Sequence, residues 1–327
     1  MINFVRSGGP IPADHLTDII AYFDGRGVDY AVYNRLCASE VTPGDAYVTC
    51  DMNVDATLDP VRDSVYQVQI SHNLTGLKGS PFGRSRADLN IVPGVQTLEA
   101  AGVEVDDERF VIGGYPKWDR IYPERFRIEE RRRAIASSHG VDPGTRWVCY
   151  YPTGPNAGFR GNAGKTARIL NRLQADLPGE FHLFFIDHAH NAGEVETRHA
   201  VEDLGVRAEI DSRLTVVEGA HALPYITACE LFITDIASAV LTALSMDKPT
   251  LFVDIQLRAG DRSAVERFQC GPYLHEIPSL ADYIESYSPP ASLRSLFLRC
   301  IEHDDDENCR RITELVLDSY ASWREAH

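Results

Sequence analysis

The chain has 327 residues, a length that is typical of two domains. Its apolar fraction of 44% is enough for ordinary hydrophobic cores. With 32 basic against 48 acidic side chains, the net charge of −16 argues against binding duplex nucleic acid through bulk charge. The seven cysteines form no C-x-x-C pair and no zinc-binding spacing, so we expect reduced thiols.

The sequence contains no segment that is typical of targeting or of membrane insertion. Its first residues lack the cationic, apolar and small-residue regions of a secretory leader, and no apolar run approaches the roughly 20 residues that cross a bilayer. We therefore expect a soluble protein of the cytoplasm that binds no nucleic acid.

The first half of the chain combines one helical pattern with several short β-rich runs. Leu16, Ile19, Ile20 and Phe23 recur at helical spacing and predict a helix over residues 13–24. Gly, Pro and Asp clusters separate the β-rich runs, which predict strands over residues 29–33, 46–50, 64–70, 89–92 and 110–112.

The amino-acid composition then changes to an Arg- and Glu-rich stretch that is typical of solvated helices. After this stretch the alternation of strands and helices restarts. We place a domain boundary in this stretch, which predicts lobes at residues 1–140 and 141–300 and a C-terminal helix at 301–327. The second half predicts strands over 147–151, 182–186, 214–217, 231–234 and 250–253, and helices over 165–176, 193–204, 224–228 and 237–246. This pattern predicts an α/β protein with two parallel sheets, in two lobes that face a cleft, where ligands bind at the carboxyl ends of the strands.

Histidines follow strands at equivalent positions in the two halves. His72 comes two residues after the strand at 64–70, and His188 and His190 follow the strand at 182–186. Imidazole titrates near neutrality and can act as a general base or donate to a phosphate. An isolated histidine is more often a surface or core residue, but a matched pair at strand ends favours a catalytic role. The sequence does not decide between His188 and His190.

A second candidate segment is the strand at 231–234 and the helix that follows it. Thr234 or Asp235 can cap this helix, and backbone N–H groups together with the Ser238 hydroxyl would form an anion site at the helix start. A capped crossover helix without any ligand is the alternative reading of the same residues.

Residues 154–166 end in Gly-Lys-Thr and invite comparison with a phosphate-binding P-loop. That motif, G-x-x-x-x-G-K-S/T, has a first glycine five residues before the glycine of its Gly-Lys-Thr end. This chain has Phe159 at the position of the first glycine. The spacing therefore argues against a P-loop NTPase and for a flexible loop after a strand.

Six segments, in order over residues 64–280, resemble motifs of the CDP-glycerol glycerophosphotransferase family, whose members build teichoic-acid-type polyol phosphate chains. The strongest is Ile-Thr-Asp-Ile-Ala-Ser at 233–238 with Lys-Pro at 248–249, which is similar to the family's Ile-Thr-Asp-Tyr-Ser-Ser and Lys-Pro. The other similar segments lie at 72–78, 114–119, 150–153, 185–189 and 270–272. The chain departs from the family at Asn73, Ala189 and Ala237, where the family has glycine, proline and serine.

The resemblance implies a glycosyltransferase-B-like fold, with an acceptor lobe at 1–140, a nucleotide-donor lobe at 141–300 and terminal helices that pack back on the first lobe. It implies transfer of a glycerol-phosphate unit from CDP-glycerol to an acceptor hydroxyl, with release of CMP. His72 would act as the general base, beside His188 and Asp235 as the other catalytic residues, with Asp235 either orienting a histidine or capping its helix. The implied donor-binding residues are Lys78, Lys117, Asp119, Thr153, Arg160, Thr234 and Ser238.

The resemblance implies no metal and no tightly bound cofactor, because the CDP-activated donor is a substrate. The expected partners are a nucleotide-activated polyol or sugar donor and a lipid-linked or glycan acceptor. Relatives that act on lipid-linked acceptors sit at the inner face of the membrane, so peripheral contact there stays open. Two alternatives also stay open: a glycosyltransferase that uses a nucleotide sugar on the same scaffold, and a catalytically degenerate binding subunit.

Overall fold

The chain forms two compact units in a computed structural model. The first comprises Met1–Pro123 and Leu298–His327, and the second comprises Glu124–Phe297. The described residues are 1–6, 10–50, 55–71, 85–152, 163–187, 208–209, 211–217, 222–235, 239–253 and 271–327. The division falls before the predicted boundary near residue 140, because α5 (Ile128–His139) packs against α8 (Ala222–Ala228) of the second unit.

The first unit is built on a six-stranded parallel sheet in the order β2-β1-β3-β4-β5-β6. Its strands are β1 (Ile2–Val5), β2 (Tyr30–Tyr33), β3 (Ala46–Thr49), β4 (Tyr66–Ile70), β5 (Leu89–Val92) and β6 (Phe110–Ile112). Its helices are α1 (Pro10–Arg26), η1 (Ala38–Glu40), α2 (Asp55–Leu58), η3 (Asp59–Ser64), α3 (Val95–Ala101), α4 (Trp118–Glu124) and α13 (Asn308–Ala326). Five of these strands match predicted runs, whereas β1 was not predicted.

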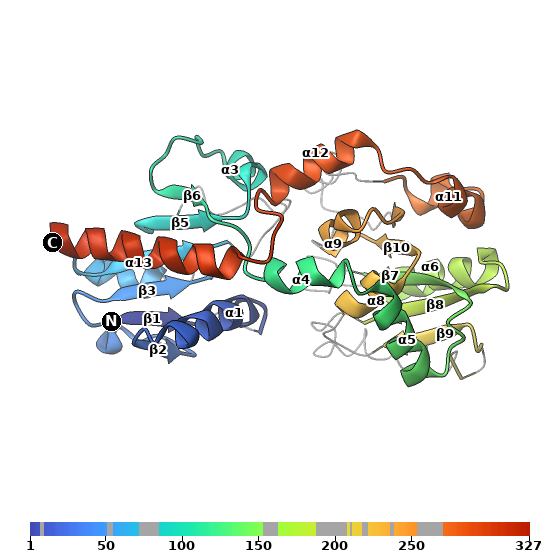
Figure 1. Cartoon of the computed structure of the whole chain (residues 1–327), viewed down its shortest axis with the longest axis horizontal. Coiled ribbons are helices and arrows are strands. Elements are labelled where there is room, and N and C mark those ends of the chain that lie inside the picture. Colours follow the sequence, from blue (N-terminus) through green and yellow to red (C-terminus); the bar gives the residue numbers. More distant parts are fainter. Residues whose placement is uncertain are drawn as a thin grey trace. The chain divides into compact units, whose positions relative to one another are not determined.

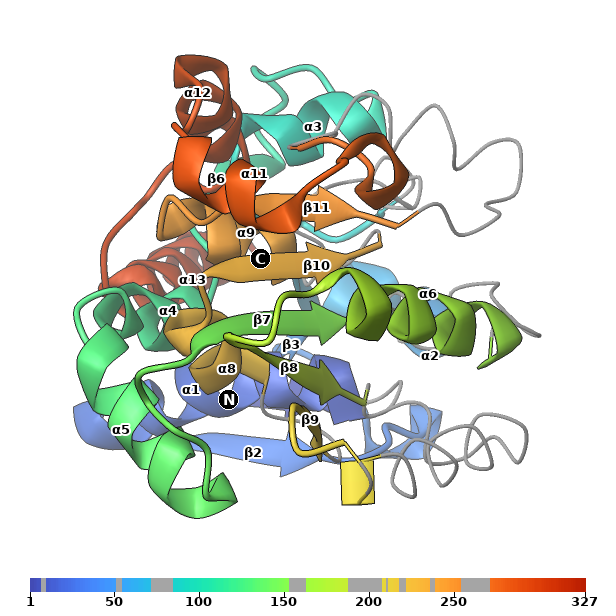
Figure 2. The ribbon, with the colours of Figure 1, turned by 90° about the vertical axis from the view of Figure 1, so that its right-hand side faces the viewer.

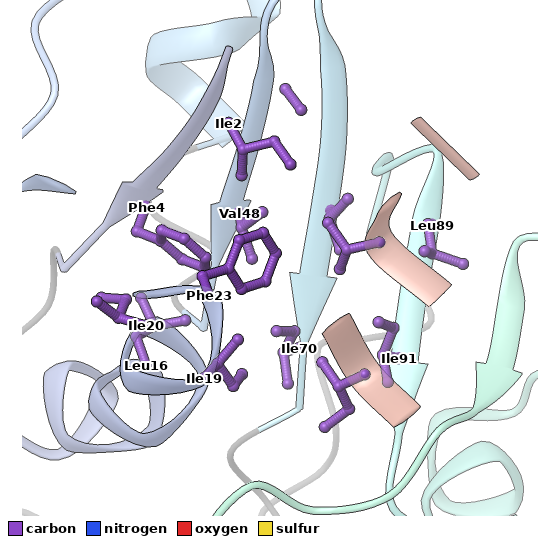
Figure 3. Packing of buried hydrophobic residues seen from close by; sticks show 14 of the residues in the cluster. Ile2, Phe4, Leu16, Ile19, Ile20, Phe23, Val48, Ile70, Leu89 and Ile91 are labelled. Atoms are coloured by element: carbon purple, nitrogen blue, oxygen red, sulfur yellow. The ribbon is translucent and has the colours of Figure 1, made fainter. Parts of the chain in front are cut away.

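Helices α1 and α13 cover one face of this sheet (Figure 1). The apolar spacing of α1 directs its side chains at the strands, and the rings of Phe4 and Phe23 meet edge to face at 5.1 Å. Figure 3 shows Leu16 and Ile19 of α1 in the same cluster as Ile70 of β4. This face is the main core of the first unit.

Helix α13 confirms the prediction that a terminal helix packs back on the first lobe. Its buried residues Ile312, Val316 and Tyr320 belong to the same core as strands from the start of the chain. Among the residues that the structure describes, no helix is both long and apolar enough to cross a membrane.

The second unit contains a five-stranded parallel sheet in the order β11-β10-β7-β8-β9. Its strands are β7 (Arg146–Tyr151), β8 (Phe181–Ile186), β9 (Leu214–Val217), β10 (Leu231–Thr234) and β11 (Thr250–Phe252). Besides α5 and α8, the remaining helices are α6 (Ala163–Asp176), α9 (Ala239–Ser245), η7 (Leu274–Glu276), α11 (Leu280–Ser286) and α12 (Ala291–Cys300), the last of which crosses into the first unit. The predicted helix at 193–204 lies outside the described residues.

Both faces of the second sheet are buried, as parallel sheets require. In the central strand β7, Val148 and Tyr150 pack with α6 and α11 on one face, while Trp147 and Cys149 pack with α5, α8 and α9 on the other. Figure 2 shows β7, β8, β10 and β11 running in the same direction, so their carboxyl ends share one edge. The predicted ligand edge of this unit is therefore formed by residues that end these strands.

Candidate functional site

Polar residues end three neighbouring strands of the second sheet. Tyr151 ends β7, Asp187 follows β8 and Asp235 follows β10. Since Tyr150 pairs with Phe185 and Tyr151 pairs with Thr234, the two aspartates lie level with Pro152 on either side of the central strand. Two strand spacings separate their Cα atoms by about 10 Å.

These carboxyl groups are buried rather than displayed on the surface. Asp235 is 1% exposed and Asp187 is 9% exposed. Burial raises the pKa of the Tyr151 phenol, and the charges of Asp235 and Asp187 raise it further. Buried carboxylates need hydrogen-bond donors and repel phosphate oxygens directly. This edge is therefore suited to orienting an imidazole or to holding sugar hydroxyl groups, with phosphate held by other residues.

Thr234 was predicted to touch the donor, and the structure gives its hydroxyl an internal partner. Its Oγ1 donates to the carbonyl of Tyr151 at 2.7 Å, and its side chain is fully buried. The N–H of Val253 donates to the Thr234 carbonyl at 2.9 Å. These bonds fix the ends of β7, β10 and β11 to one another, so Thr234 shapes the edge on which Asp235 stands.

The Lys-Pro segment of the strongest motif lies at the opposite, amino edge of the same sheet. Lys248 is 7% exposed, and its Nζ donates to the carbonyl of Cys229 at 2.6 Å, directly after α8. The Arg132 guanidinium donates to the neighbouring carbonyl of Ala228 at 3.4 Å. Two cations thus meet the negative end of the α8 dipole, which identifies Lys248 as a helix-stabilising residue.

Asp119, another predicted donor-binding residue, caps α13 inside the first unit. Its two carboxylate oxygens accept the N–H groups of Asn308 and Cys309, each at 2.7 Å. These are the first N–H groups of the helix, which have no intrahelical partner. A role at the donor stays a prediction for Asp119, but both of its oxygens already have backbone partners.

The rest of the 114–119 segment also holds α13. Gly114 has a φ of +108°, and a Cβ there would stand 2.1 Å from Oδ1 of Asn308, which accepts the N–H of Tyr115 at 3.1 Å. The buried Trp118 donates through Nε1 to Asp304 at 3.1 Å. Lys117 is half-buried within this segment, and its predicted phosphate contact stays a prediction.

The other predicted site residues lie outside the described residues. In sequence, each follows a strand of the two sheets: β4 precedes His72 and Lys78, β7 precedes Thr153 and Arg160, β8 precedes His188, and β10 precedes Ser238. The structure therefore confirms the strands that lead to these residues and leaves their contacts as predictions. Asp187, which was not among the predicted site residues, lies directly before His188.

A groove of about 690 Å³ lies in the second unit beside β11. Its lining comprises Gly271, Pro272, Glu276, Tyr283, Ser286, Tyr287, Ser288, Pro290, Ser292 and Leu293. None of the predicted site residues is among them. Its one charged side chain, Glu276, accepts the N–H of Tyr273 at 2.8 Å, so the lining offers no positive charge to a phosphate.

Metal ligands were not predicted from the sequence. Within the described ranges, no three His, Cys, Asp or Glu side chains come together as a metal-binding group.

Two consecutive units, each with a parallel sheet between helices, define the glycosyltransferase-B-like class of α/β folds, as predicted. Among solved structures, the chain is similar to the wall teichoic acid polymerase TagF, with a TM-score of 0.61 and 14% identity over 98% of this chain and 90% of that chain. It is also similar to S. aureus MnaA in complex with UDP, with a TM-score of 0.61 and 13% identity over 96% of this chain and 95% of that chain.

A third similar structure is Anabaena HepE in complex with UDP and glucose, with a TM-score of 0.54 and 13% identity over 97% of this chain and 99% of that chain. No family model matches the sequence, and no curated protein matches it. At these identities the likeness establishes the fold, and it agrees with the family resemblance that the motifs indicated.

Proposed function

We propose that this protein transfers a glycerol-phosphate unit from CDP-glycerol to an acceptor hydroxyl, with release of CMP, in the synthesis of a cell-surface polymer or glycan. The observation that carries the proposal is the buried set of Tyr151, Asp187 and Asp235 at one sheet edge, from which three of the family-like segments continue. The fold shared with TagF over nearly the whole chain supports it, and one TagF structure is described as soaked with CDPG.

The proposed reaction is an in-line displacement at the β-phosphorus of the donor. The acceptor oxygen forms a bond to this phosphorus while the bond from the phosphorus to the bridging oxygen breaks, and CMP leaves with the electron pair. His72 removes the proton from the acceptor hydroxyl. A well-placed general base contributes about 10²–10⁴-fold to the rate.

The donor-side residues divide into two chemical groups in this proposal. His188, Ser238 and Thr153 donate hydrogen bonds to the pyrophosphate, and Lys78, Lys117 and Arg160 supply positive charge. The buried carboxylates of Asp187 and Asp235 do the opposite: they accept hydrogen bonds from an imidazole or from the ribose hydroxyls. This division follows from charge, because a buried carboxylate cannot face a phosphate without a large electrostatic cost.

The proposal requires no tightly bound cofactor, since the activated donor is consumed in each turnover. The acceptor would be a lipid-linked chain or a glycan. A lipid-linked acceptor would bring the protein to the inner face of the membrane as a peripheral enzyme of the cytoplasm.

A second candidate function is transfer of a sugar from a nucleotide sugar. The solved structures of MnaA and HepE that are similar to this chain contain UDP, and the latter also contains glucose. The carboxylates of Asp187 and Asp235 suit sugar hydroxyl groups as well as ribose.

Thermal unfolding with a panel of donors separates the two candidates, because a ligand that binds the native state raises the melting temperature. We expect CDP-glycerol to give a larger rise than CDP-ribitol, UDP-glucose or CMP-sialic acid, and Asp235→Asn to reduce it. Asp282→Asn, an exposed change in the same unit, is the matched control and should leave the rise unchanged. A largest rise with UDP-glucose would favour sugar transfer, and no rise with any CDP compound would contradict the proposed donor.

A further inference from the structure

The groove in the second unit lies beside β11, the strand at one edge of its sheet. Helix α11 lies next to this strand (Figure 2), and its Leu280 belongs to the same core cluster as Leu251 of β11. The Tyr283 hydroxyl donates to the carbonyl of Thr250, the first residue of β11, at 3.2 Å. The groove therefore reaches the amino end of β11, whereas Asp235 belongs to the ligand edge, which follows the carboxyl ends of the strands.

Contacts within the unit hold the walls of the groove in place. Gly271 lies so close to β11 that a Cβ there would stand 2.1 Å from the carbonyl oxygen of Thr250. The rings of Tyr283 and Tyr287 meet at 61°, with their centroids 5.9 Å apart. A groove whose walls are held in this way is pre-organised, which lowers the entropic cost of binding a ligand.

The size and the composition of the groove suit a small ligand. Its volume of about 690 Å³ falls within the range of roughly 300–1,000 Å³ that is usual for small-molecule sites. The two tyrosine rings and the hydroxyl groups of Ser286, Ser288 and Ser292 line it. The Ser286 hydroxyl donates to the carbonyl of Asp282 at 2.7 Å, so its oxygen can still accept a hydrogen bond. The lining thus offers flat apolar surfaces and hydrogen-bonding groups side by side.

The charge of the lining excludes several classes of ligand. Among the described residues that line the groove, Glu276 is the one charged side chain and none is basic. A phosphate or a nucleotide would meet no positive charge there, and the Glu276 carboxylate would repel it. Among the same described residues, Leu293 is the one aliphatic side chain besides two prolines, which is too little apolar surface for an acyl chain or an apolar helix. The ligand that fits is uncharged and carries both apolar faces and hydroxyl groups.

Carbohydrates have this combination of groups. The C–H faces of a sugar ring pack on aromatic rings, and its hydroxyl groups donate to a carboxylate and exchange hydrogen bonds with serine. We propose that the groove binds a neutral saccharide, with Tyr287 as the ring on which the sugar packs and Glu276 as an acceptor for its hydroxyl groups. The inference goes beyond the proposed function, because it involves neither the CDP-activated donor nor a catalytic residue.

The test is saturation-transfer difference NMR with three neutral disaccharides, maltose, cellobiose and N,N′-diacetylchitobiose, in the absence of nucleotide. We expect the wild type to transfer saturation to the ring protons of one or more of them. Tyr287→Ala removes the ring on which the sugar packs and should raise the Kd of that disaccharide at least about tenfold, whereas Tyr287→Phe keeps the ring and should leave the Kd nearly unchanged.

A second pair of variants decides the matter if Tyr287→Ala does not fold. Ser292→Trp fills part of the groove with a bulky side chain, and Ser295→Trp places the same side chain at an exposed position of α12 outside the lining. We expect Ser292→Trp to raise the Kd at least about tenfold and Ser295→Trp to leave it unchanged.

No saturation transfer from the wild type to any of the three disaccharides would overturn the proposal. A Kd that Ser292→Trp leaves unchanged would also overturn it, since the sugar would then bind elsewhere on the protein. The measurement includes no nucleotide and no turnover. Its failure would therefore leave the proposed function intact, and failure of the proposed donor would leave the groove intact.

Discussion

At the scale of single residues, Asp119 and Gly114 lie in a segment whose resemblance implied donor binding, yet their contacts hold α13. Asp119 supplies from α4 the cap that α13 lacks at its own start, where Glu307 makes no side-chain cap bond. A carboxylate at this end also interacts favourably with the helix dipole. A motif can thus recur in related folds because its residues hold a helix in place.

We expect Asp119→Ala to lower the free energy of unfolding by about 1–2 kcal/mol, as the loss of a helix cap does. Urea unfolding measures this loss, with the exposed Asp106→Ala in the same unit as a control of little effect. The donor-dependent rise in melting temperature should survive the change. Intact stability with a lost response to the donor would instead assign Asp119 to the donor site.

His182 gives the second unit a pH dependence. It is 5% exposed, its Nε2 lies 2.8 Å from Oγ1 of Thr215, and burial lowers its pKa to about 4. Between pH 6.5 and 4 the unfolded chain binds a proton that the folded chain does not. The free energy of unfolding therefore decreases as the pH is lowered through this window, and above pH 6.5 this group has no effect on stability.

We expect this group to remove about 3 kcal/mol of stability between pH 6.5 and 4. Urea unfolding at several pH values, compared between wild type and His182→Gln, measures it. The variant should lose less stability than wild type over the same window, and identical pH profiles would contradict the assignment.

At the scale of elements, the sequence predicted ten of the eleven strands found among the described residues, because Gly, Pro and Asp clusters bound each β-rich run. It missed β1, a run of four residues with three apolar side chains that is too short to distinguish from a helical segment. Only the pairing of β1 with β2 and β3 reveals it. The sequence also could not show that Lys248 donates to the carbonyl of Cys229 at the end of α8.

We expect Lys248→Met to destabilise the second unit by about 1–3 kcal/mol, because the carbonyl of Cys229 would lose a charged donor inside the protein. Chemical unfolding measures the loss, with the exposed Arg133→Met on α5 as the matched control. Equal stability of the two variants would contradict the helix-stabilising role of Lys248.

At the scale of the whole molecule, the last helix completes a core whose other residues come from the first 91 residues of the chain. Tyr66 stacks on Tyr320 at 5.9 Å, and the Tyr320 hydroxyl donates to the carbonyl of Gly44 at 2.6 Å. Such long-range closure means that the first unit depends on residues that follow the second unit in the sequence.

A chain that stops at Glu307 should therefore lose the first unit and retain the second. Limited proteolysis followed by mass spectrometry should find residues 124–297 protected and residues 1–123 digested. Protection of both regions in the shortened chain would show that α13 is dispensable.

The sequence could predict where the candidate site lies, but it could not predict which residues contact one another there. Parallel sheets place ligands at strand ends, so the sequence could identify Asp235 and the segment after β8. It could not show that Thr234 donates to Tyr151, or that Asp187 and Asp235 are buried level with each other, since both facts depend on the register of strands distant in sequence.

The central claim is that this chain transfers a polyol phosphate from a CDP-activated donor, with His72 as the base. The most direct measurement is CMP release from CDP-glycerol, with and without a polyol-phosphate or lipid-linked acceptor, in wild type and in His72→Ala. We predict acceptor-dependent release that falls by at least about 100-fold in the variant. Equal release by the two proteins would contradict the role of His72, and no release with any acceptor would contradict the donor itself.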